Sequence, residues 1–115
     1  MSQISPQEAS DILEKLFSEK VRVSTFFNTS SGARVRLDGF LTGARPEEGL
    51  FITSRPDGGG DWINVRPFKV AGMCTFSYGE AREVGEELRG SILGESALII
   101  NFLATGKHFA IFFTL

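Results

Sequence analysis

The sequence predicts a mainly β protein, an antiparallel split or closed β-barrel of about six to seven strands with one N-terminal α-helix. Apolar residues follow a helical period only up to residue 19, and from residue 20 they alternate with a period of two. Glycine and proline then divide the chain into short segments of even length. With 115 residues, 42% of them hydrophobic, we expect one domain over 1–115, with the helix over about 5–19 and the barrel over about 20–115.

The helix is predicted from its start signal and from a single apolar stripe. Ser5 suits the N-cap, Pro6 suits the first helical position and Glu8 can complete a capping box. Four apolar residues then fall on one face: Ile12, Leu13, Leu16 and Phe17. This stripe predicts that the helix packs across an open end or a face of the sheet.

The first two strands are predicted to form a hairpin. Val21–Phe27 alternates apolar and polar residues, Asn28–Gly32 has the composition of a hairpin loop, and Ala33–Leu37 alternates again. A glycine inside a strand usually marks a bulge or a sharp bend, so we expect one at Gly39, with Phe40–Thr42 continuing the strand beyond it.

Glycine-rich turns divide the middle of the chain. Further strands are predicted at Leu50–Ser54, Trp62–Val70 and Met73–Tyr78. The segments Gly43–Gly49 and Arg55–Asp61 separate the earlier strands as a turn and a loop, and Pro67 requires an edge strand or a bulge. The acidic stretch Gly79–Gly94 has room for one short helical turn around Glu83–Leu88.

The last predicted hairpin, Ala97–Leu103 and Lys107–Leu115, is apolar on both faces. One face can fill the barrel, whereas the other must be covered by the helix, by residues 79–94 or by a second copy of the chain. The sequence does not decide whether these apolar residues belong to the core or to an interface. A homodimer through this hairpin is one expectation, and it makes Phe109, Phe112 and Phe113 candidate interface residues.

The residue types needed for common catalytic and metal sites are scarce. His108 and Cys74 are the only histidine and the only cysteine, which is too few soft ligands for a zinc site. The apolar neighbours of Cys74 are expected to raise its thiol pKa, which opposes a role as a nucleophile. We therefore assign no catalytic, cofactor-binding or metal-binding residue, and we expect a protein that is not an enzyme.

Charge and exposed side-chain types suggest a protein partner more than a nucleic acid. The net charge is −2, and residues 20–70 carry eight bases against five acids, +3, spread over strands and loops rather than gathered in one run. Candidate interaction residues are Trp62, Arg34, Arg36, Arg66, Phe109, Phe112 and Phe113. Anion binding by Arg34 and Arg36 stays an open alternative.

The start of the sequence lacks the basic and apolar regions of a secretory signal. No run of about 18 apolar residues is present that could form a membrane span. The expected location is therefore the cytoplasm.

A series of short motifs from residue 12 to about 103 resembles the N-terminal split-barrel domain that precedes PilZ domains in bacterial flagellar-brake proteins. The matching segments are Ile12–Phe17, Val21–Val23, Gly39–Gly43, Leu50–Pro56, Val65–Phe68 and Ala97–Ile100. This resemblance implies a regulatory or protein-interaction module linked to cyclic-di-GMP and motility signalling. The Arg-x-x-x-Arg linker and the later Asp/Asn-x-Ser-x-x-Gly of the nucleotide site are absent, so no ligand residue is carried over.

Two alternatives stand beside this interpretation. Residues 10–54 also resemble the first part of an Sm-like RNA-binding barrel, but the second Sm motif is not found after residue 60. Flavin-binding split-barrel oxidoreductases place basic and hydroxyl residues around a phosphate, and Arg34, Arg36 and Thr42 have the matching residue types.

Overall fold

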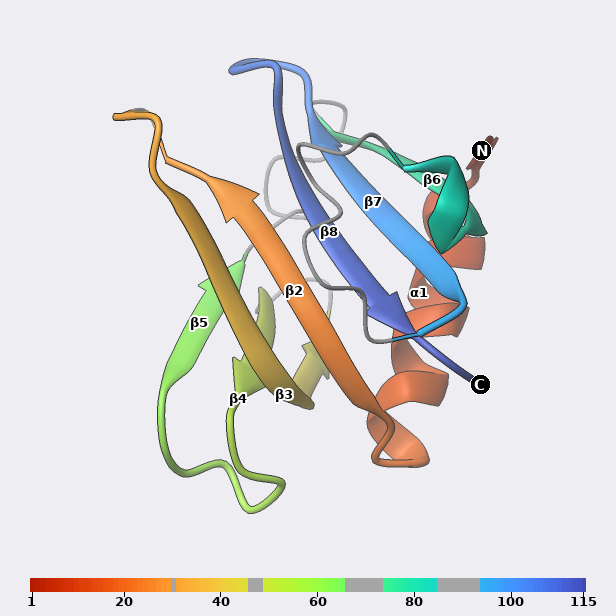
Figure 1. Ribbon diagram of the computed structural model, residues 1–115. Coiled ribbons are helices and arrows are strands. Elements are labelled where there is room, and N and C mark those ends of the chain that lie inside the picture. Colours follow the sequence, from red (N-terminus) through yellow and green to blue (C-terminus); the bar gives the residue numbers. More distant parts are fainter. Residues whose placement is uncertain (30, 46–48, 66–73, 85–93) are drawn as a thin grey trace.

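The computed structural model describes residues 1–29, 31–45, 49–65, 74–84 and 94–115, and the structural statements below concern these residues. They form one eight-stranded antiparallel sheet in the order β1-β6-β7-β8-β2-β3-β4-β5, with one α-helix, α1, packed on it (Figure 1). The elements are β1 (Ser2–Ile4), α1 (Pro6–Ser18), β2 (Arg22–Asn28), β3 (Arg34–Arg45), β4 (Gly49–Thr53), β5 (Trp62–Val65), β6 (Cys74–Glu80), the 3-10 turn η1 (Ala81–Glu83), β7 (Ser96–Phe102) and β8 (Lys107–Phe113). The mainly β, antiparallel fold with one N-terminal helix is confirmed.

Helix α1 has the start that the sequence predicts. The Ser5 hydroxyl accepts a hydrogen bond from the Glu8 backbone N–H at 3.1 Å, and Pro6 is the first helical residue. At the other end, the N–H groups of Lys20 and Val21 donate to the carbonyls of Phe17 and Leu16, which closes the helix with a Schellman motif. The motif sends the chain straight into β2.

Strand β3 continues past Gly39, as predicted, but its irregularity lies further on. The register against β4 shifts between Leu41 and Gly43, so the expected bulge at Gly39 is wrong. Gly39 instead marks a close approach, because a Cβ built on it would lie 2.0 Å from the Thr53 carbonyl oxygen. Only glycine lets the two strands meet there.

Several element bounds differ from the predicted ones. Residues 43–45 extend β3 and Gly49 begins β4, so the turn between them is shorter than expected. The helical turn expected around Glu83–Leu88 falls mostly on residues 85–93, which lie outside the described residues. The chain forms the 3-10 turn η1 just before them. The fourth predicted strand is described only over Trp62–Val65, so Arg66 and Pro67 are not described. Strand β1 was not predicted, because three residues are too few to show a period.

The main core lies between α1 and the inner face of the sheet. Its fully or almost fully buried members are Ala9, Leu13, Leu16, Val23, Leu41, Leu50, Ile52, Phe76, Leu98, Ile100, Phe109, Ile111 and Phe113. The helix contributes its apolar stripe, as predicted, except that Phe17 lies at its margin and is exposed. Within the described residues no helix is long and apolar enough to cross a membrane.

A second, smaller core covers the outer face of the terminal hairpin. It consists of Phe26, Ala81, Val84, Ala97, Ile99, Ala110 and Phe112. Phe26 and Phe112 pack edge to face with their ring centroids 5.6 Å apart. Apart from the turn and the C-terminal end, the apolar residues on both faces of the hairpin strands are therefore buried or partly buried within a single chain. The outward-facing Ala97, Ile99, Ala110 and Phe112 belong to a core and not to a free surface.

Candidate functional site

A groove opens at the end of the sheet where α1 stops and where the β4–β5 loop turns. These two segments lie at the bottom of Figure 1. The volume of the groove is about 710 Å³. We call it the aromatic groove, after its main lining residues Phe17, Lys20, Phe51, Thr53, Pro56 and Trp62. It joins the last turn of the helix to the outer face of β3–β5.

Three aromatic side chains in the aromatic groove are exposed. Trp62 is 66% exposed, Phe51 39% and Phe17 38%, and no other aromatic side chain of the described residues is exposed to this degree. Leaving such rings in water forgoes a large part of the free energy that burial would give. Isolated exposed apolar residues are ordinary, whereas a convergent set marks a binding surface.

The pleat of the sheet places two of these rings. In β4, Leu50 and Ile52 point into the core, so Phe51 between them points outward. Phe51 lies against Gly43, where a Cβ would come within 3.3 Å of its ring. Trp62 stands opposite Thr53 on the same outer face of the sheet. The bulge in β3 and the small residue after it make room for the Phe51 ring.

The loop between β4 and β5 is held by its own hydrogen bonds. The Asp57 carboxylate accepts from the Gly59 N–H at 2.8 Å, and the Ser54 hydroxyl accepts from the Asp61 N–H at 3.0 Å. Gly58 lines the groove with a φ of +91°, which residues with side chains rarely adopt. The wall of the groove is thus an ordered turn.

Lys20 supplies the cation at the helix end of the groove. Its φ of 51° is the left-handed conformation, and no other residue with a side chain has a positive φ in the described parts of the chain. Its ammonium makes no ion pair with any described residue, whereas Asp57 on the opposite wall is paired with Arg55, whose Nε lies 3.8 Å from the Asp57 carboxylate. Among the described lining residues, Lys20 is therefore the charged side chain without an ion-pair partner, and it lies beside the rings.

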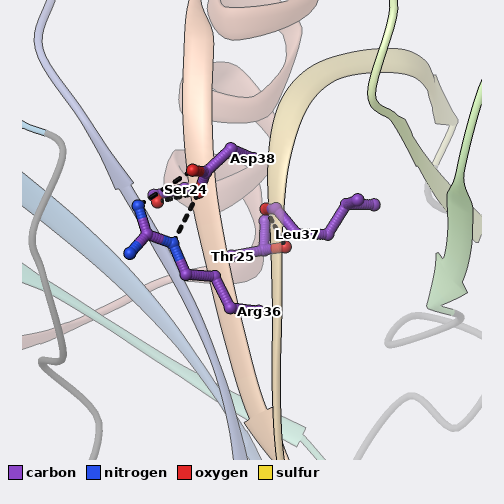
Figure 2. A network of polar contacts seen from close by, with 5 residues as sticks. All are labelled: Ser24, Thr25, Arg36, Leu37 and Asp38. Atoms are coloured by element: carbon purple, nitrogen blue, oxygen red, sulfur yellow. Dashed lines mark hydrogen bonds and ion pairs between the residues drawn. The ribbon is translucent and has the colours of Figure 1, made fainter.

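Arg36 is engaged elsewhere, on the outer face of β3 (Figure 2). Its guanidinium donates to both carboxylate oxygens of Asp38 at 2.9 and 2.8 Å, and the buried Ser24 hydroxyl donates to the same carboxylate. Hydrogen bonding by Arg36 lowers the pKa of Asp38, and hydrogen bonding by Asp38 raises the pKa of Arg36. Arg36 also lies over the Phe26 ring, 5.4 Å from its centroid. These contacts stabilise the pairing of β3 with β2.

Cys74 and His108 do not meet. Cys74 pairs with Phe102 and faces the main core, whereas His108 pairs with Asn101 on the outer face, where its Nδ1 lies 2.7 Å from the Asn101 amide oxygen. Burial raises the pKa of the Cys74 thiol, which opposes thiolate formation. Among the described residues no group of three or more His, Cys, Asp or Glu side chains could hold a metal ion.

Of the candidate interaction residues, the structure brings only Trp62 to the groove, and Thr42, which the sequence analysis named for the flavin alternative, also lines it. Arg34 is exposed at the start of β3, and Arg66 lies outside the described residues. Phe109, Phe112 and Phe113 are buried. The sequence interpretation missed Phe51, whose outward position follows from the alternation of β4, and Phe17, which it assigned to the helix core. It also missed Lys20, since nothing in a sequence reveals a left-handed lysine.

Comparison with known proteins gives no relative. No protein-family model, no curated protein and no solved structure matches the chain. The site must therefore be interpreted from its own geometry.

Proposed function

We propose that this chain is a non-catalytic interaction module, which binds an apolar segment of a partner protein in the aromatic groove. The observation that carries the proposal is the convergence of Phe17, Phe51 and Trp62, the three exposed aromatic side chains of the described residues, on one groove. Aromatic rings that are half-exposed and held by strands and a helix end are typical anchors of protein recognition.

The chemistry of the groove defines the segment that it would accept. Rings of this kind suit proline or aromatic side chains, and the indole N–H of Trp62 offers one donor to a backbone carbonyl. The single uncompensated charge of Lys20 favours an acidic residue next to the apolar anchor. The partner segment in this proposal is therefore short, apolar and acidic.

The flagellar-brake resemblance supports the same class of function, because it implies a barrel that docks on another domain. A regulatory role in motility signalling is part of this proposal. It predicts that the intact protein, used as bait, captures a PilZ protein or a flagellar or pilus component.

Peptide binding in the aromatic groove can be measured without an added label, because Trp62 is the only tryptophan of the chain and its fluorescence reports on the groove. A library of short peptides is selected on the wild-type protein and counter-selected on the double variant Trp62→Ala, Phe51→Ala. The enriched peptides are expected to carry a proline or aromatic anchor beside an acid. Each should shift the fluorescence of Trp62 in a saturable way.

The matched control for this selection is Leu103→Ala. It removes an equally exposed apolar side chain, 58% exposed, at the far β7–β8 turn, and it should bind the selected peptides as the wild type does. Peptides that bind the double variant equally well would contradict the proposal. A flavin spectrum of the purified protein, or salt-sensitive retention of single-stranded RNA, would favour the enzyme or the Sm-like alternative instead.

A further inference from the structure

A second hollow lies at the opposite end of the sheet, near the turns of the β2–β3 and β7–β8 hairpins. These two turns are at the top of Figure 1. The volume of the hollow is about 350 Å³. We call it the end pocket, after its main lining residues Phe27, Ile63, Val65, Phe102, Lys107 and Phe109. Trp62 points to the outer face of β5 and Ile63 to the inner face, so the two sites are separate.

The walls of the end pocket are apolar and largely aromatic. Phe27 on β2 and Phe109 on β8 stack with their centroids 5.9 Å apart and their planes 26° apart. Phe102 on β7 and the side chains of Ile63 and Val65 on β5 are only partly buried against the core. Their remaining surface is therefore available to a flat apolar ligand.

Lys107 brings a cation to this apolar pocket. It lies two residues before Phe109 on β8 and opposite Phe102 on β7, so the pleat turns its side chain to the inner face. A lysine in this position runs its methylene stem along apolar surface and holds its ammonium at the edge. The ammonium makes no ion pair with any described residue, and none of the described residues that line the pocket is acidic.

Neighbouring polar groups do not offset this charge. His108 also lines the pocket, and its Nδ1 lies 2.7 Å from the Asn101 amide oxygen. The other polar lining residues in the described parts of the chain are Asn28, Asn64 and Thr105, which are neutral. Within the described part of the chain, the end pocket thus combines aromatic walls with the charge of Lys107, which has no acidic partner there.

We propose that the end pocket binds a small aromatic carboxylate, with its ring against the partly buried Phe27 and Phe102 and its carboxylate at the Lys107 ammonium. A volume of 350 Å³ is near the lower limit of ligand pockets, which restricts the ligand to about two fused rings. The charge of Lys107 selects an anion over a neutral molecule of the same shape. This site does not depend on the function proposed for the aromatic groove.

The test compares 2-naphthoate with 2-naphthalenemethanol, which has the same rings without the charge. Both are titrated into the protein and followed by amide chemical shifts in ¹H–¹⁵N spectra. The shifts should centre on the amides of Phe27, Val65 and Phe109. Naphthoate should bind about tenfold more tightly than the alcohol, which corresponds to one charge-assisted hydrogen bond.

Two variants distinguish the contribution of the Lys107 charge to binding from the contribution of the apolar walls of the pocket. Lys107→Gln should lower the affinity for naphthoate to that of the alcohol, whereas Lys15→Gln, which removes an exposed lysine on α1, should leave it unchanged. Val65→Trp fills the pocket and should abolish the binding of both compounds, with the spectrum of the folded protein as its check. No binding at millimolar concentration, equal affinities for the two compounds, or a Lys107→Gln variant that binds naphthoate as the wild type does would each overturn the proposal.

Discussion

At the scale of single residues, Lys20 is held in a conformation that favours glycine. The left-handed region costs a residue with a Cβ about 1–2 kcal/mol. Glycine avoids this cost but loses about 0.5–1 kcal/mol more conformational entropy on folding. The difference predicts that Lys20→Gly raises the free energy of unfolding by about 0.5–1 kcal/mol in urea titrations.

The control for this variant is Lys20→Ala, which removes the charge and keeps the Cβ. It should not stabilise the protein, because the alanine is strained in the same way. If the aromatic groove binds an acidic segment, both variants should weaken that binding while only one of them gains stability. A Lys20→Gly protein less stable than the wild type would show that the helix end does not have this conformation.

Asp38 gives the protein a component of stability that depends on pH. Its pKa is lowered in the folded protein, first by hydrogen bonding to Arg36 and then by Ser24. A lowered folded-state pKa stabilises the fold above the usual carboxyl pKa of 3.8, and this contribution is lost as the pH falls through the folded value. Asp38→Asn should therefore lower the free energy of unfolding by about 1 kcal/mol at pH 7.

The pH series supplies the decisive measurement for Asp38. The difference in the free energy of unfolding between the wild type and Asp38→Asn should become steadily smaller below about pH 4. Asp11→Asn, a change of the same kind at an exposed position on α1, should cost little at any pH. A gap of constant size from pH 7 to pH 3 would mean that the charge of Asp38 contributes nothing.

At the scale of elements, two glycines of β3 have different roles. A Cβ on Gly39 would meet the backbone of Thr53, which can yield only if the β3–β4 pairing shifts. A Cβ on Gly43 would meet the ring of Phe51, an exposed side chain that can rotate away. Gly39→Ala should therefore cost about 3 kcal/mol of stability and Gly43→Ala less than about 1 kcal/mol, both measured by thermal unfolding. Equal costs would contradict this account of β3.

These glycines also show which structural features can be predicted from sequence patterns and which cannot. The period-two alternation predicts β2 and β4 to within two residues, because each of these strands has an inner and an outer face. The apolar runs on both sides of Thr105-Gly106 predict the terminal hairpin equally closely, because both of its faces lie in a core. A glycine inside a strand marks an irregularity of some kind. Whether it permits a bulge or a close approach depends on the partner strand, and that information is tertiary.

The aromatic groove illustrates the same limit for a site. Trp62 beside a glycine-rich loop is visible in the sequence as a candidate binding residue. Its companions Phe17 and Phe51 come from segments that are 34 residues apart in the chain and that each serve the core through other side chains. Only the packing of α1 against β3 brings them to one groove, and no local pattern encodes that packing.

At the scale of the whole molecule, the terminal hairpin is the centre of two cores. Its inner residues pack under α1, and its outer residues pack with Phe26, Ala81 and Val84. The apolar run that suggested a homodimer is thus covered within one chain. A homodimer stays a prediction, and it would need a surface other than these buried side chains.

Phe112 allows the roles of core and interface to be distinguished. Its side chain is fully buried within one chain, so removing it leaves a cavity whatever the assembly state. Phe112→Ala should lower the free energy of unfolding by about 3–5 kcal/mol, and the milder Phe112→Leu by about 1–1.5 kcal/mol. Leu103→Ala, an exposed position at the turn of the same hairpin, should change the stability by less than about 0.5 kcal/mol.

The dependence of the Tm on protein concentration then shows whether Phe112 lies in the core of one chain or in a dimer interface. If Phe112 is core, the loss in Tm for Phe112→Leu is the same at 1 and 100 micromolar protein, and sedimentation equilibrium gives the same mass for the variant and the wild type. If it lies in a dimer interface, dilution lowers the Tm of the wild type by mass action, and the variant shifts toward the monomer mass. The packing of Phe112 against Phe26 within one chain predicts the first result.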